Sequence, residues 1–152
     1  MRRLTPALCL TILMVVFSAA AAGEFGLGIM AGEPTGLSLK GWLSDAGAVD
    51  AALGWSVGDE DWFYLHADYL RHGFDMDVQD VDEGTFYYYG IGARVLLREG
   101  HESKLGARVP VGLCYFFEDQ NIDVFIELAP VFNLIPETTL GLSGGIGARF
   151  WF

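Results

Sequence analysis

A period-two alternation of apolar residues with small or polar ones runs through almost the whole chain and restricts it to β-structure. Eight segments show this pattern, and turn-forming or acidic residues separate them. Successive side chains of a strand point to opposite faces of its sheet, so the pattern predicts strands that each have one apolar face. The predicted strands cover residues 24–32, 35–43, 47–57, 62–71, 85–97, 104–116, 122–133 and 138–152.

The lengths of these segments favour a barrel that crosses a membrane. Each has about the 9–11 residues that a tilted membrane strand needs, or slightly more. Hydrophobic residues make up 52% of the chain. Even so, no apolar run after residue 22 approaches the roughly 18 residues of a spanning helix. The sequence therefore predicts an all-β fold, an eight-stranded antiparallel up-and-down transmembrane β-barrel.

Residues 1–22 have the features of a cleavable signal peptide. Two arginines precede an apolar stretch from Leu8 to Phe17, and the small residues Ala20 to Ala22 follow it. Such a segment directs export and is removed from the mature protein. We therefore expect an exported protein of the cell outer membrane, with a single barrel domain over residues 23–152.

Charge and cysteine content exclude several kinds of partner and linkage. Without residues 1–22, seven basic residues remain against twenty acidic ones, which gives a formal net charge of −13. This balance argues against binding to nucleic acid and against electrostatic docking onto anionic lipid. Cys114 is the only cysteine after residue 22, so we expect no internal disulfide bond.

The direction of the two strand faces decides between a membrane barrel and a soluble one. Opposite the apolar face lie mostly glycine and serine with a few charged residues. An eight-stranded barrel has an interior just wide enough for side chains to fill, which suits glycine and a few long charged side chains. We expect this face to point inward and its charges to form an ion-paired network without an open channel. A soluble periplasmic lipocalin-like carrier, with the apolar face inside, is the alternative. The predicted network consists of Lys40, Asp50, Asp68, Arg94, Arg108, Glu127 and Arg149.

Aromatic residues gather at the two ends of the predicted strands. Amphipathic rings prefer the two interfaces of a bilayer, so the sequence predicts two aromatic girdles on the outside of the barrel. One girdle, at the end that holds both termini of the domain, comprises Phe25, Trp42, Tyr69, residues 86–89, 115–117 and 150–152, and the other comprises Trp55, Trp62, Phe63 and Phe132.

Two prolines interrupt the pattern inside neighbouring strands. Pro110 and Pro130 fall at similar heights in the predicted strands 104–116 and 122–133. Proline has no N–H to donate to a strand ladder. We therefore expect a shared local gap in the pairing, most simply a β-bulge, with a lateral opening as the alternative.

One set of residues supports an enzymatic hypothesis. His66 and Asp68 are two residues apart on one strand and face the same side, so the carboxylate could orient the imidazole as a general base. Ser56 or Ser143 would supply the hydroxyl nucleophile of a triad-like set. This alternative is a barrel-embedded lipid-modifying enzyme, a lipid A acyltransferase or deacylase. The main expectation is no catalytic activity, and no metal, cofactor or nucleotide motif is present.

Several motifs resemble those of known barrels. The outward alternation of Ile146, Ala148, Phe150 and Phe152 at the C-terminus resembles the β-signal that the bacterial barrel-assembly machinery recognises. The whole domain resembles the small OmpA- and OmpX-like eight-stranded barrels, and more closely a family of uncharacterised bacterial outer-membrane β-barrel proteins. The motifs that carry this second likeness are residues 88–94, 108–113, 127–131 and 144–149.

The resemblance implies a fold and a location but no activity. Together with the residue patterns, it predicts a monomeric outer-membrane barrel with a structural or surface role. Its expected partners are outer-membrane lipid and, during biogenesis, the barrel-assembly machinery.

Overall fold

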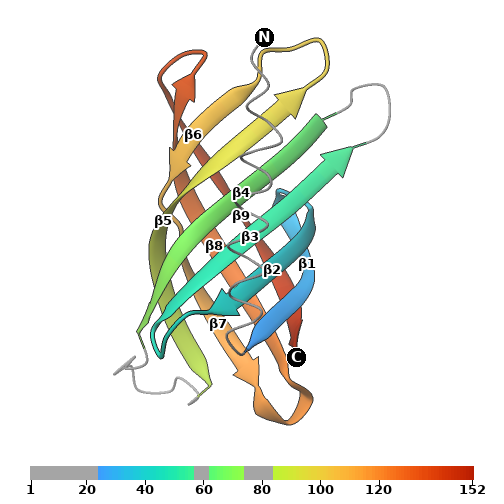
Figure 1. Ribbon diagram of the computed structural model, residues 1–152, viewed down its shortest axis with the longest axis vertical. Coiled ribbons are helices and arrows are strands. Elements are labelled where there is room, and N and C mark those ends of the chain that lie inside the picture. The colour runs from blue at the N-terminus through green and yellow to red at the C-terminus, as the bar shows by residue number, and fades with distance from the viewer. Residues whose placement is uncertain (1–23, 57–61, 74–83) are drawn as a thin grey trace.

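The protein is described by a computed structural model, which covers residues 24–56, 62–73 and 84–152. The predicted signal peptide over residues 1–22 lies outside these described residues. Within these described residues, nine antiparallel strands wind into a tall barrel (Figure 1). In the part of the chain that the structure describes, no helix has the length and apolar character needed to cross a membrane. In chain order the elements are β1 (Phe25–Glu33), β2 (Gly36–Trp42), β3 (Gly47–Ser56), β4 (Trp62–Gly73), β5 (Thr85–Arg98), β6 (Lys104–Arg108), β7 (Val111–Phe117), the 3-10 turn η1 (Glu118–Gln120), β8 (Ile122–Ile135) and β9 (Thr139–Trp151).

Pairing between neighbours in the chain accounts for the barrel topology. β1 pairs with β2, and the ladders continue through β3 and β4 to β5. β6 and β7 both lie between β5 and β8, and β8 pairs with β9. β9 in turn pairs with β1, so the ladders return to the strand on which they began. The predicted up-and-down antiparallel β-barrel is therefore confirmed, with strand bounds within two residues of the predicted ones for seven of the eight segments.

The remaining predicted strand, 104–116, is divided into β6 and β7 by Val109 and Pro110. The register of this segment against both β5 and β8 is the same on the two sides of the break. The expected β-bulge at the prolines is therefore wrong, because a bulge would add one residue to one strand. A register shift does occur on this strand, but between Leu105 and Gly106.

The two prolines each remove one hydrogen bond from the ladder and leave another in place. Gly90 N still donates to Pro110 O at 2.9 Å, and Val109 N donates to Pro130 O at 3.0 Å. In a regular hydrogen-bonded pair the two residues exchange two such bonds. The strand is therefore weakened at this point but keeps its place between its neighbours.

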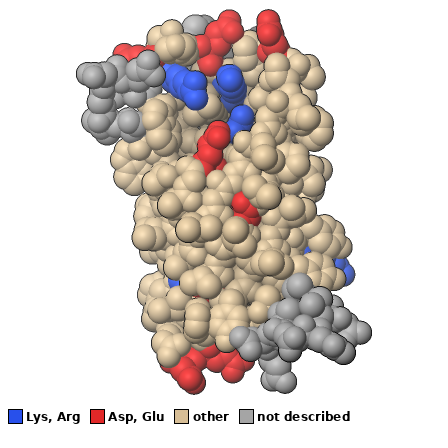
Figure 2. All heavy atoms as spheres, turned by 180° about the vertical axis from the view of Figure 1, so that it is seen from behind, with Lys and Arg blue, Asp and Glu red and all other residues tan. Residues whose placement is uncertain are grey.

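The burial pattern is that of a barrel with a polar interior. Arg108 is fully buried, and Arg94 and Arg149 are 6% and 2% exposed. Apolar side chains are exposed around the outside, and Figure 2 shows a broad, mostly uncharged surface between charged groups near the two ends. The predicted inward direction of the glycine-rich face is confirmed, and a lipocalin-like arrangement would require the reverse. The most exposed apolar residues of the strands are Ile29, Ile91, Leu140, Leu142 and Ile146.

The prediction for the aromatic residues was wrong in part at both ends, because Trp62 at the second end is in phase with the buried Tyr64 and also faces inward. Tyr69, Tyr87, Tyr89 and Phe117 are exposed on the outside, but the alternate rings on the same strands turn inward. Position along the strand alone does not determine the face, because each step of one residue reverses it. At the first end, the inward rings are those of Trp42, Phe86, Tyr88, Phe116 and Trp151.

Candidate functional site

The polar interior is the part of the molecule with the greatest concentration of chemically active groups. All seven residues of the predicted network are buried: Lys40, Asp50, Asp68, Arg94, Arg108, Glu127 and Arg149. They come from β2, β3, β4, β5, β6, β8 and β9 respectively, so almost every strand contributes one charge. The structure brings some of them into direct contact and leaves others apart.

Arg108 lies at the centre of the largest group of contacts. Its Nε is 3.0 Å from Asp68 Oδ2, and its Nη2 donates to Glu127 Oε1. Its Nη1 donates to the Tyr64 hydroxyl at 3.3 Å and to His66 Nδ1. One guanidinium therefore joins side chains from β4 and β8 across the inside of the barrel. We call Arg108 with Tyr64, His66, Asp68 and Glu127 the Arg108 cluster.

Glycines on the intervening strands let these partners meet. Asp68 on β4 is in register with Gly92 on β5, and Gly92 is in register with Arg108 on β6. A Cβ atom at Gly92 would overlap Asp68 Oδ1 and the Ala67 carbonyl. The absence of a side chain on β5 thus opens the path along which an acid and a base two strands apart can pair.

A second glycine has the same role on β7. Tyr88 on β5 is in register with Gly112, which is in register with Glu127 on β8. The Tyr88 hydroxyl reaches over Gly112 and donates to Glu127 Oε2 at 3.0 Å, and a Cβ at Gly112 would overlap the Tyr88 ring. Both carboxylate oxygens of Glu127 are therefore satisfied, one by Arg108 and one by Tyr88.

Two further arginines have partners nearer the ends of the barrel. Arg149 Nε donates to its cross-strand neighbour Asp123, at 3.0 Å from Oδ1, and Trp151 Nε1 donates to Asp123 Oδ2 at 2.9 Å. At the other end, Arg94 donates to Asn133 Oδ1 at 3.0 Å and pairs with Glu33 at 3.2 Å. Glu33 lies at the barrel mouth, where its side chain is half-exposed.

Lys40 and Asp50 do not pair as their register would suggest. They are cross-strand neighbours on β2 and β3 and both face inward. The Lys40 ammonium instead donates to His72 Nε2 at 2.7 Å, and it lies 5.2 Å from the Trp42 ring centre and 5.1 Å from that of Tyr88. Within the described ranges Lys40 forms no ion pair, and Asp50 Oδ1 is buried without a hydrogen-bond partner.

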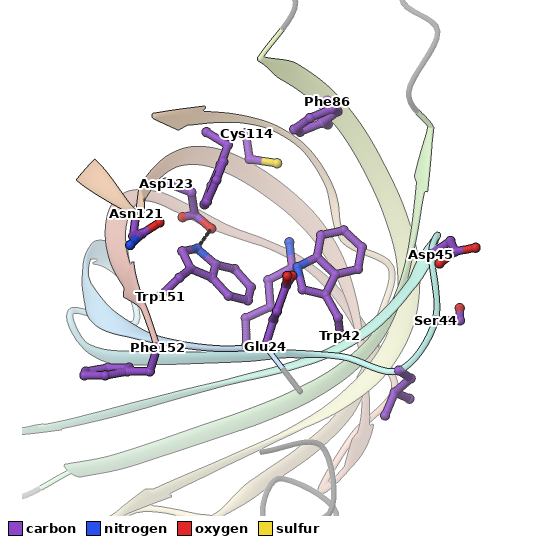
Figure 3. A pocket seen from close by; sticks show the side chains of 13 residues that line it. Glu24, Trp42, Ser44, Asp45, Phe86, Cys114, Asn121, Asp123, Trp151 and Phe152 are labelled. Atoms are coloured by element: carbon purple, nitrogen blue, oxygen red, sulfur yellow. Dashed lines mark hydrogen bonds between the residues drawn. The ribbon is translucent and has the colours of Figure 1, made fainter. Parts of the chain in front are cut away.

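A cavity of about 810 Å³ occupies the barrel end next to Lys40. It lies at the end that holds Glu24 and Phe152, and Figure 3 shows Trp42 and Trp151 next to each other in its wall, with ring centres 6.3 Å apart. Most of its inner wall is aromatic, and its exposed rim carries Glu24, Ser44 and Asp45. The remaining residues that line it are Lys40, Leu43, Phe86, Cys114, Phe116, Asn121 and Asp123.

One group of three buried residues has the spacing of a metal site, but two of the three already contact Arg108. The group consists of Asp50, His66 and Asp68. Each offers a ligand atom, and these atoms lie within 4.8 Å of one another. However, Arg108 donates to His66 Nδ1, so a neutral ring carries its proton on Nε2, which is the nitrogen nearer Asp68. Arg108 also pairs with Asp68. The contacts of His66 and Asp68 with Arg108 therefore favour an ion-paired cluster over a metal site.

The residues of the enzymatic hypothesis are only partly brought together. His66 Nε2 lies 3.8 Å from Asp68 Oδ2, which is longer than a hydrogen bond. Ser143 Oγ donates to the Ala129 carbonyl at 3.4 Å, and no interaction joins it to His66 among the described residues. Ser56 is the last residue of β3, and its side chain lies outside the described residues.

Sequence reasoning missed several members of the interior. Asp123 is in phase with Glu127 on the same strand, so the alternation of faces could have predicted that Asp123 points inward. Tyr88 was assigned to an outer girdle, His72 lay beyond the predicted strand 62–71, and Tyr64 was given no role although it is in phase with His66. Glu33 was assigned to a turn, and only the three-dimensional structure shows it paired with Arg94.

Comparison with known proteins supports the fold. No family model matches the sequence, and no curated protein matches it either. Among solved structures, the N-terminal β-barrel domain of Pseudomonas aeruginosa OprF is similar to this chain, with a TM-score of 0.57 and 16% sequence identity. The match covers 85% of this chain and 96% of that one. At this identity the likeness shows the fold, which confirms the OmpA-like barrel expected from the sequence.

Proposed function

We propose that the protein is an outer-membrane β-barrel with a structural or surface role, whose interior is filled at mid-height by paired polar side chains. The observation that carries this proposal is the inverted distribution of polarity. Between its two ends the outside of the barrel is mostly apolar, and three arginines, one lysine and four acids are buried inside. Water would favour the opposite arrangement, whereas hydrocarbon favours this one.

The apolar exterior supports a lipid environment. Single exposed apolar residues are normal on soluble proteins, but large continuous apolar surfaces mark contact with a partner or a membrane. Here exposed residues such as Ile91, Leu142 and Ile146 lie on strands all around the barrel. Strand ladders that run from β1 around to β9 and back also satisfy the backbone where lipid offers no partner.

The Arg108 cluster supports a filled interior rather than a pore. Buried charges need ion-pair and hydrogen-bond partners, and Arg108 has three hydrogen-bond partners and an ion pair with Asp68, from β4 and β8. Eight strands leave an interior that side chains of this size can occupy. We therefore expect no continuous aqueous path through the barrel.

Export and assembly complete the proposal. Residues 1–22 would direct the chain across the inner membrane, and the C-terminal segment would be read by the barrel-assembly machinery. Ile146, Phe150 and Phe152 are exposed on the outside of the barrel wall, where another protein could contact them. The protein would then function as a monomer in contact with outer-membrane lipid, and we propose no catalytic role for His66 or Asp68.

Fractionation and conductance measurements test this proposal. The mature chain, without residues 1–22, should be recovered in the outer-membrane fraction, and its migration in gels should change when the sample is boiled. In planar bilayers the purified protein should give no stepwise conductance. Recovery in the osmotic-shock supernatant would contradict the membrane location, and stable conductance steps would contradict the filled interior.

A further inference from the structure

The cavity beside Lys40 has the size and composition of a ligand site. Small-molecule sites usually have volumes of about 300–1,000 Å³, with mostly apolar walls and a few placed polar groups. This cavity measures about 810 Å³, and its inner walls include Trp42, Phe86, Phe116 and Trp151. Figure 3 shows the rings of Trp42, Phe86 and Trp151, which come from β2, β5 and β9, around one open space.

Among the described residues, Lys40 is the buried charged group of this cavity that forms no ion pair. Asp123 also lines the cavity, but Arg149 and Trp151 already satisfy it. Lys40 is 2% exposed and uses one of its three N–H donors on His72. The rings of Trp42 and Tyr88 stabilise the ammonium but do not neutralise it.

The acid in register with Lys40 does not supply that counterion. Asp50 is its cross-strand neighbour, and no ion pair forms between them in the described structure. A buried ammonium without a contacting anion is costly, so an anion that enters the cavity would gain more here than at an exposed lysine. The acidic rim residues Glu24 and Asp45 are exposed, and salt screens their repulsion.

We propose that this cavity binds a small amphipathic carboxylate, with the carboxylate on Lys40 and the apolar body among the four aromatic rings. Rings in edge and face orientations, such as Trp151 with Phe116 at 6.3 Å between centres, can pack against a flat or flexible apolar group. The inference does not depend on where the protein is located, because it concerns the cavity alone.

Three matched probes test the proposal on the purified protein. Anthracene-9-carboxylate, 9-anthracenemethanol and 9-(aminomethyl)anthracene share one ring system and differ in charge. Binding is followed by energy transfer from tryptophan to anthracene. The carboxylate should bind saturably and at least tenfold more tightly than the amine. Equal affinities, tighter binding of the amine, or no saturable binding of any probe would overturn the proposal, and this comparison requires no variant.

Two lysine variants then test whether the ammonium of Lys40 binds the carboxylate. Lys40→Met should lower the affinity for the carboxylate at least tenfold and change that for the alcohol less than threefold. Lys104→Met makes the same chemical change at the start of β6, outside the cavity, and should leave both affinities unchanged. If Lys40→Met does not fold, Lys40→Arg should retain preference for the carboxylate over the amine. Unchanged carboxylate binding in Lys40→Met, or loss of the preference in Lys40→Arg, would overturn the assignment.

Discussion

Asp68 on β4 and Arg108 on β6 pair across Gly92 of the strand between them, with 3.0 Å from the Asp68 Oδ2 to the Arg108 Nε. Tyr88 and Glu127 meet across Gly112 in the same way. The glycines of the inner face therefore do more than fit a narrow interior. They allow side chains two strands apart to join, which ties non-adjacent parts of the wall together.

The first prediction concerns the space above Gly92. Gly92→Ala places a methyl group against Asp68 Oδ1 and the Ala67 carbonyl, so the Asp68–Arg108 pair must separate. Overpacking of this kind costs about 1–3 kcal/mol of unfolding free energy. Gly141→Ala is the matched control, because its new methyl group would have only ordinary contacts, at 3.8 Å from Asn133 Nδ2 and 3.9 Å from the Val131 carbonyl oxygen. Urea unfolding of the folded protein should show a loss for the first variant and little change for the second.

The second prediction concerns the charge at the centre of the cluster. Arg108→Met leaves Asp68 and Glu127 buried without their counterion, and breaking a buried pair in this way costs about 3–5 kcal/mol. Arg98→Met removes an exposed arginine and should change stability by less than about 0.5 kcal/mol. The same unfolding assay measures both. Equal stability of the two variants would show that the cluster does not hold the interior together.

Much of this arrangement could be predicted from the sequence, because alternation reports the face of each residue. It identified Lys40, Asp50, Asp68, Arg94, Arg108, Glu127 and Arg149 as a group, and each is buried. It could not identify the partners, because these depend on register and on side-chain paths across two strands. Lys40 and Asp50 illustrate the limit, since they are neighbours in register but do not pair. The cavity was missed because the aromatic residues were assigned by height along the strand rather than by face.

The third prediction concerns His66. Its Nδ1 accepts a hydrogen bond from Arg108, so we expect a structural role. Expression of the wild-type chain and of His66→Gln should give cells with identical lipid A, as measured by mass spectrometry. A lipid A modification that appears with the wild type and is lost in the variant would instead support the lipid-modifying enzyme.

The fourth prediction concerns the proline gap between β6 and β7. Gly90 sits opposite Pro110, which cannot return a hydrogen bond, whereas Gly92 sits opposite Arg108 in a regular part of the same ladder. The Gly90 amide should therefore exchange with solvent at least tenfold faster than the Gly92 amide, as measured by NMR in detergent micelles. Equal protection of the two glycines would mean that the prolines do not weaken the ladder.

The most direct test of the account replaces one outward isoleucine at a time with lysine. Ile91 lies in the middle of β5 and Ile135 at the end of β8, and they are 65% and 53% exposed. In a bilayer, lysine costs about 2–4 kcal/mol at the midplane and about 0–1 kcal/mol near the interface. Urea unfolding in phospholipid vesicles should therefore show a large loss of stability for Ile91→Lys and a small one for Ile135→Lys. Equal, near-zero effects at both positions would contradict the claim that the apolar face of this barrel meets lipid.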